Sequence, residues 1–155
     1  YSILPSNNSV KVQNDWHQGF ILESIIHFLE SIDSKNSDYI SSLRKGAKFY
    51  SRQFTDEGAS YWRYPIFYPI NIHNQSQGII TFTKLTDYFD EYGILADKIM
   101  KFTNKHFLSS EGYYYHQIVG RLTDKTSYMR WSQAWMMLAL TIFVKHKLDK
   151  KSRKA

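Results

Sequence analysis

Apolar residues recur every three to four positions along most of the chain, which is the spacing that one face of an α-helix requires. In residues 16–32 this stripe follows Asn14 or Asp15, and either side chain can cap the start of a helix. The same spacing predicts further helices from a cap at Ser37 to about residue 54, and over about 73–91, 94–107 and 128–148. The pattern therefore predicts an all-α fold.

Two segments interrupt the helical spacing. The aromatic run 61–69 contains Pro65 and Pro69, which exclude a regular helix, so this run is predicted to be a loop. The run 113–123 is rich in Tyr, Ile and Val and turns at Gly120. That composition predicts one short β-hairpin near 113–123, and at most one in the chain.

The sequence also repeats itself. Gln18, Gln77 and Gln133 lie 59 and 56 residues apart, and each is followed by a small residue and an apolar run. A repeat of this length that contains two helices and a loop is typical of stacked helical hairpins. The chain should hold two full hairpins and the first helix of a third. The small residue after each Gln predicts close packing between the inner helices.

Three segments around these glutamines carry a family resemblance: Asn14-Asp-Trp-His-Gln-Gly-Phe-Ile-Leu22, Pro69-Ile-Asn-Ile-His-Asn-Gln-Ser-Gln-Gly78 and Tyr128-Met-Arg-Trp-Ser-Gln-Ala-Trp-Met136. They resemble an uncharacterised bacterial group of (α/α) toroid proteins, whose members often sit near polysaccharide genes. That group is similar to the six-hairpin glycosidase superfamily, which includes glucuronyl hydrolases and sugar epimerases.

The resemblance implies a fold and a function. Residues 1–148 should form part of an (α/α)6 toroid, followed by a basic tail at 149–155. A closed toroid needs six hairpins, so we expect either further hairpins before Tyr1 or self-association of the open ends. The implied function is a carbohydrate-active domain, hydrolase-, lyase- or epimerase-like, acting on a bacterial poly- or oligosaccharide. The alternative is a non-catalytic helical-repeat module that binds a glycan or a protein.

Composition and charge narrow the partners. Residues 1–144 carry 14 Lys or Arg and 13 Asp or Glu, whereas the last eleven residues carry six Lys or Arg and one Asp. A net +5 of the total +6 thus lies in the last eleven residues, and this basic end is predicted to be solvated, without a nucleic-acid partner. The absence of Cys excludes disulfides and thiolate chemistry. We also expect no cofactor, no metal, no membrane insertion and a cytoplasmic location.

The aromatic share of 17% exceeds what a core of this size needs, so some rings should line a surface or a pocket. In a toroid the first turns of the inner helices line the central cleft. The predicted sugar-holding residues come from these turns and from the aromatic loops: Trp16, Gln18, Asn74, Gln77, Tyr128, Trp131, Gln133, Tyr61, Trp62, Tyr114 and His116. Alternatively, Trp131 is a core residue, because it lies one helical turn before Trp135 and on the same helix face.

Four residues are candidates for chemistry. Asp15 is either a helix cap or a catalytic acid, and the second role needs another carboxylate nearby, which the sequence does not supply in an obvious place. His17 and His73 occupy similar positions in successive repeats and could act as general acid and base. Alternatively, each of them bonds a neighbouring helix or caps a helix end. Arg130 could grip an acidic sugar through its planar guanidinium.

Overall fold

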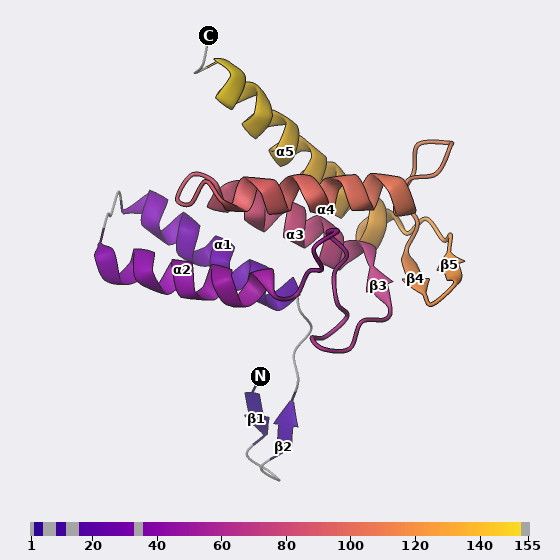
Figure 1. Cartoon of the computed structure of the whole chain (residues 1–155), viewed down its shortest axis with the longest axis horizontal. Coiled ribbons are helices and arrows are strands. Elements are labelled where there is room, and N and C mark those ends of the chain that lie inside the picture. The colour runs from indigo at the N-terminus through magenta and orange to yellow at the C-terminus, as the bar shows by residue number, and fades with distance from the viewer. Residues whose placement is uncertain (1, 5–8, 12–15, 33–35, 153–155) are drawn as a thin grey trace.

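The computed structural model describes residues 2–4, 9–11, 16–32 and 36–152, and these are mostly helical (Figure 1). The α-helices are α1 (Trp16–Ser31), α2 (Ser37–Ser51), α3 (Ile72–Leu85), α4 (Tyr92–Phe107) and α5 (Trp135–Ser152), and a π-helix at Met129–Ala134 leads into α5. The strands are β1 (Ser2–Leu4), β2 (Ser9–Lys11), β3 (Ile70–Asn71), β4 (Gln117–Val119) and β5 (Leu122–Asp124). The predicted helical class is confirmed.

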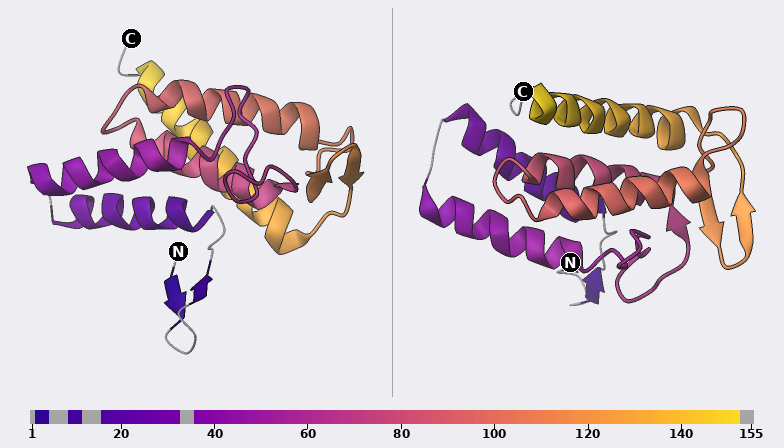
Figure 2. Two further views of the ribbon diagram at one scale, coloured as in Figure 1. Left: turned by 60° about the horizontal axis from the view of Figure 1, so that its bottom comes forward. Right: turned by 45° about the horizontal axis from the view of Figure 1, so that its top comes forward.

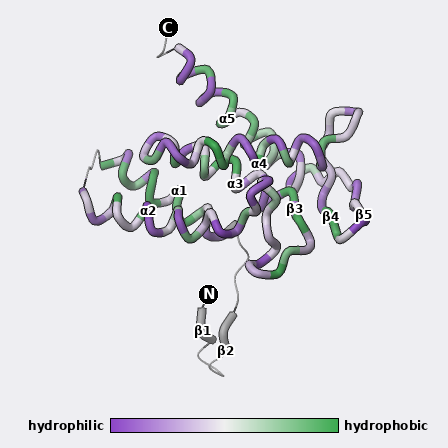
Figure 3. The backbone as a smooth tube through the Cα atoms, viewed as in Figure 1, coloured by the Kyte–Doolittle hydropathy of each residue, from purple (hydrophilic) through white to green (hydrophobic). Residues whose placement is uncertain are grey.

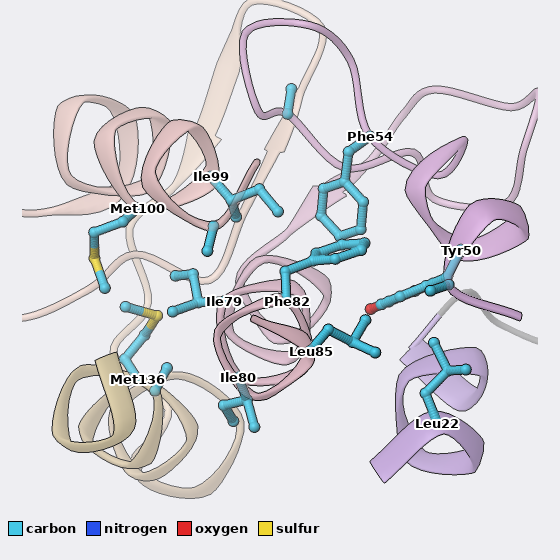
Figure 4. Packing of buried hydrophobic residues seen from close by; sticks show 14 of the residues in the cluster. Leu22, Tyr50, Phe54, Ile79, Ile80, Phe82, Leu85, Ile99, Met100 and Met136 are labelled. Carbon is cyan, nitrogen blue, oxygen red and sulfur yellow. The ribbon is translucent and has the colours of Figure 1, made fainter. Parts of the chain in front are cut away.

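Helix α3 is the centre of the molecule. It packs against α1, α4 and α5, while α2 packs against α1, so the pairs α1–α2 and α3–α4 form two helical hairpins (Figures 1 and 2). Seen end-on, α3 lies between α4 and α5 on one side and α1 and α2 on the other (Figure 4). Hydropathy alternates along each helix, as expected for helices with one buried side (Figure 3).

The core is apolar and centred on the second half of α3. Phe82 stacks on Tyr50 of α2 with ring centroids 5.1 Å apart, and Ile79 lies between Ile99 of α4 and Met136 of α5 (Figure 4). All five side chains are almost fully buried. This packing fixes α3 and thereby positions the residues at its N-terminal end.

The close packing predicted between inner helices is confirmed at Gly19, which meets α3, whereas Gly78 packs closely against Phe54 and Ile99 instead of another inner helix. A Cβ added to Gly19 would lie 2.6 Å from the Cγ atom of Gln77, and one added to Gly78 would lie 2.4 Å from the Cζ atom of Phe54. Side chains of ordinary size do not fit at such distances. The glycines therefore let α1 and α3 approach their neighbours.

The repeat has a different register from the one that the sequence predicts. The side chain of Gln75 accepts a hydrogen bond from the backbone N–H of Ser60, at 2.7 Å, and donates one to the carbonyl of Gly58. Gln133 does the same with both backbone groups of Tyr114, at 3.1 and 2.7 Å. Gln75, not Gln77, is thus the equivalent of Gln133. Residues two apart on a helix face different directions, and Gln77 faces α1 instead.

Several predicted boundaries were wrong. Helix α2 is capped by Asn36, whose side chain accepts from the N–H of Asp38 at 2.8 Å, and not by Ser37. Helix α3 ends at Leu85 instead of near residue 91, because the Thr86 hydroxyl donates to the carbonyl of Thr83 and the chain turns there. A short polar side chain that bonds the preceding turn competes with further helix.

The limit of one β-hairpin was also wrong. The hairpin of β4 and β5 forms as predicted around Gly120, where φ is +60°, but β3 adds a third strand by pairing Ile70 with Ile118. A second hairpin joins β1 to β2. A strand of two or three residues is too short to show an alternating pattern, so its pairing depends on distant backbone partners.

The described part of the basic tail, residues 149–152, belongs to the last helix. Helix α5 runs past residue 148 to Ser152, so the expected boundary falls inside it. Lys147 forms an ion pair with Asp97 at 2.6 Å, and Lys150 forms one with Asp90 at 3.2 Å. These two lysines therefore pair with acidic residues on α4 and in the turn before it.

Candidate functional site

A cleft of about 420 Å³ lies where the three-stranded sheet meets the starts of α3 and the π-helix. Its lining comes from separate elements: Asn71 from β3, His73 from the first turn of α3, His116 next to β4, Tyr128 before the π-helix, and Trp131 within it. In Figure 1 these elements gather at the end of the molecule that carries β3, β4 and β5. Four of the five residues are sequence-predicted, and Asn71 is not.

His73 forms the base of this cleft. Its ring is 5% exposed, and its centroid lies 4.6 Å from Trp135 and 5.5 Å from Trp131. Burial among these rings, assisted by the charge of His17, lowers the pKa of His73 from 6.5 to about 4. The imidazole is therefore neutral at neutral pH and holds no second proton to donate.

His116 is held on both ring nitrogens. Its Nδ1 atom lies 3.0 Å from Oδ2 of Asp124, and its Nε2 atom lies 3.4 Å from the amide nitrogen of Asn71. Its backbone N–H also donates to the carbonyl of Asp124 at 3.0 Å. The ring of Tyr128 stands edge-on to His116, with 4.8 Å between centroids. A carboxylate behind an imidazole orients it and stabilises its charged form, as a general base requires.

Asp124 is an ionised carboxylate. Hydrogen bonds from the side chain of Thr126, from His116 and from the backbone N–H of Thr126 lower its pKa from 3.8 to about 2. The hydroxyl of Thr126 donates to Oδ1 at 2.7 Å, which leaves Oδ2 to accept from His116. The tight turn after β5 thus presents one oxygen of this carboxylate to the imidazole.

Asn71 was missed by the sequence analysis. Its Oδ1 atom accepts from the backbone N–H of His73 at 2.8 Å, so Asn71 is the N-cap of α3. A signal was present, because Asn is a preferred cap and it stands directly before the predicted helix. What the sequence did not reveal is that the other half of the amide reaches His116.

The structure brings His17 close to the cleft. His17 lies in the first turn of α1, its ring is 6.5 Å from Phe20, and its charge lowers the pKa of His73. Gln18 is half-buried beside it. Asp15 lies outside the described residues, and of Trp16 only the backbone is described. The predicted neighbourhood of His17 and His73 is therefore present.

Other predicted sugar-holding residues bond the protein interior. Asn74 donates to the carbonyl of Tyr61 at 2.8 Å, and Gln77 donates to Glu23 and Thr81 between α1 and α3. Gln133 holds the backbone of Tyr114, as described above. Tyr114 is buried, its hydroxyl donates to Asn104 at 2.8 Å, and burial raises its pKa. Asn74 and Gln133 thus hold loop backbone, Gln77 joins two helices, and none of these residues lines the cleft.

Arg130, Tyr61 and Trp62 do not line the cleft. Arg130 is exposed on the π-helix, next to Trp131 in the chain. Tyr61 is half-buried and packs edge-on against Phe67, with 5.3 Å between centroids. Trp62 is half-buried, and the guanidinium of Arg63 lies 5.7 Å from its ring.

The described residues contain no group of three or more His, Asp or Glu side chains that could hold a metal ion. Within the same part of the chain, no helix is long and apolar enough to cross a membrane. No known protein family matches the chain, and a search of curated proteins finds no significant match.

Proposed function

We propose that this chain is a carbohydrate-active domain that acts on a bacterial poly- or oligosaccharide, with His116 as its general base. The observation that carries the proposal is the placement of His116. It combines an ionised carboxylate at Nδ1 with a position in a cleft that has aromatic side chains on its walls. The proposal agrees with the family resemblance of the sequence.

The walls of the cleft suit a sugar ring. Trp131 and Tyr128 are 48% and 43% exposed, so each ring retains an open surface on which the C–H face of a sugar can stack. Asn71 and His116 add polar atoms that can bond hydroxyl groups. Arg130 lies close in the chain to both aromatic residues, and it would attract an acidic sugar.

The chemistry that we assign to His116 is proton removal. Nε2 would accept a proton from a hydroxyl group or from a carbon atom of the bound sugar, while Asp124 stabilises the resulting imidazolium. The neutral His73 would bond the substrate, since a ring with a pKa of about 4 is a weak base at neutral pH. These roles suit a hydrolase-, lyase- or epimerase-like reaction.

We further propose that the helical hairpins are part of an (α/α)6 toroid. The first turns of α1 and α3 meet at His17 and His73, and the π-helix that leads into α5 reaches the same point through Trp131. Apolar side chains are exposed on both flanks of the array, such as Ile21 on α1 and Leu148 on α5. Neighbouring hairpins of a larger toroid would cover these flanks.

Binding to an array of bacterial glycans, followed by calorimetry, tests the proposal. Trp131→Ala and Tyr128→Ala should each weaken binding at least tenfold. Tyr39→Ala is the matched control, because Tyr39 is 42% exposed but lies on α2, outside the cleft. Turnover of a bound glycan should be lost in His116→Gln while binding persists. A wild-type chain that binds no glycan contradicts the proposal.

A non-catalytic glycan-binding module is the second candidate. The neutral state of His73 favours this candidate, because a neutral His73 cannot act as the general acid and would serve binding alone. Binding that depends on Trp131 but produces no turnover in the wild-type chain would select this alternative.

A further inference from the structure

We propose that Asn71 is a positioning residue that holds His116 as the neutral Nδ1–H tautomer, with the lone pair of the ring on Nε2. The inference deepens the proposed function, because it concerns the residue assigned there as the base. It follows from one side chain that makes two contacts in opposite directions: one to the start of α3 and one to the imidazole.

The first contact fixes the orientation of the amide. The backbone N–H of His73 can only donate, so the atom of Asn71 that faces it at 2.8 Å must be the carbonyl oxygen. The NH₂ group then has to point the other way, where it meets Nε2 of His116 at 3.4 Å. Asn71 is 8% exposed, so it has little room to turn toward solvent.

The second contact fixes the state of the imidazole. An NH₂ group has no lone pair to offer, so the Nε2 atom that faces it must be the acceptor. On the other side of the ring, the ionised Asp124 accepts at 3.0 Å, so Nδ1 carries the proton. His116 is therefore the neutral Nδ1–H tautomer, with its lone pair on Nε2.

Asn71 and Asp124 act in opposite directions on this ring. The carboxylate of Asp124 alone would favour a doubly protonated imidazolium, which cannot act as a base. The amide of Asn71 opposes the second proton, because two N–H groups would then face each other. Among the described residues, the other titratable groups that line the same cleft are His73, which is neutral at neutral pH, and Tyr128, whose ring stands edge-on to His116. Asn71 thus opposes a proton on Nε2 while its amide faces the ring.

Asn71→Asp separates this role from helix capping. A carboxylate caps α3 as well as an amide does, so fold and thermal stability should be retained. Its second oxygen faces Nε2 and accepts where the amide donated. His116 should then carry a proton on Nε2 in place of the lone pair that faces the amide of the wild-type chain. Nitrogen NMR of the chain labelled on histidine distinguishes the two tautomers and the imidazolium directly.

Asn36→Asp is the matched control. Asn36 caps α2 through the same contact, here to the N–H of Asp38, and it does not face His116. This variant should leave the NMR pattern of His116 unchanged. Asn71→Ser, which retains a capping oxygen but has no amide, should give a mixture of His116 states in place of one tautomer.

Two results would overturn the inference: an Nε2–H tautomer in the wild-type chain, or an unchanged Nδ1–H pattern in folded Asn71→Asp. The wild-type spectrum decides the matter even if the variant does not fold. None of these readouts needs a sugar. A chain that shows the expected tautomers but binds no glycan would contradict the proposed function and leave the role of Asn71 intact.

Discussion

At the scale of single residues, the cleft combines two imidazoles with opposite environments. His73 is surrounded by rings and loses its charge, whereas His116 has a carboxylate partner that favours a charge. Both types of environment act through the same physics, since burial disfavours a charged ring and an ionised neighbour favours it. His73 and His116 therefore cannot take the same chemical role.

His73 should make stability depend on pH. Its pKa is about 4 in the folded chain and 6.5 when unfolded, so below pH 6.5 protons bind the unfolded state first. The free energy of unfolding should fall by about 3 kcal/mol as the pH drops from 7 to 4. Urea unfolding of His73→Gln should show a smaller fall over this range. His27→Gln, at an exposed position, is the control, and equal pH dependence in His73→Gln and wild type would refute the prediction.

At the scale of elements, each of two loops is joined by one glutamine amide to the helix that follows it. Gln75 holds the turn at Gly58, and Gln133 holds the strand-like segment at Tyr114. Each loop has left-handed glycine geometry, with φ of +96° at Gly58 and +86° at Gly112. The aromatic loop 61–69 and the sheet beside the cleft both depend on these anchors.

Loss of the Gln75 amide should be costly. Gln75→Ala leaves the N–H of Ser60 and the carbonyl of Gly58 buried without this partner, which should destabilise the chain by about 2–3 kcal/mol. Chemical denaturation measures the change. Gln18→Ala, at a half-buried position, should cost less than about 1 kcal/mol. A similar effect of both substitutions would mean that the amide does not anchor the loop.

At the scale of the whole molecule, the array of helices has an apolar flank at either end. Ile21, Phe28 and Tyr39 are exposed on α1 and α2, and Val144 and Leu148 are exposed on α5. Contiguous exposed apolar side chains usually mark a surface that contacts another protein segment. In the isolated chain, these flanks are open to a second copy.

The isolated chain should therefore associate with itself. Light scattering should show a mass that rises with concentration, and Ile21→Lys combined with Phe28→Lys should reduce it toward one chain of 18.4 kDa. Leu122→Lys is the control, since Leu122 is 75% exposed on the β4–β5 hairpin, outside both flanks. A monomer at every concentration tested would show that the flanks do not drive association.

The sequence by itself determined the helical class, the helical hairpins, the close packing of α1 on α3 at Gly19, and four residues of the cleft. Helical spacing and small-residue positions are local signals, because they arise from the geometry of a single helix. Tertiary structure alone decided the register of Gln75 with Gln133, the pairing of β3 with β4, and the contact between Asn71 and His116. Each of these depends on hydrogen bonds between groups far apart in the chain. The sequence shows that an asparagine or glutamine is present, but it does not show which partner its amide binds.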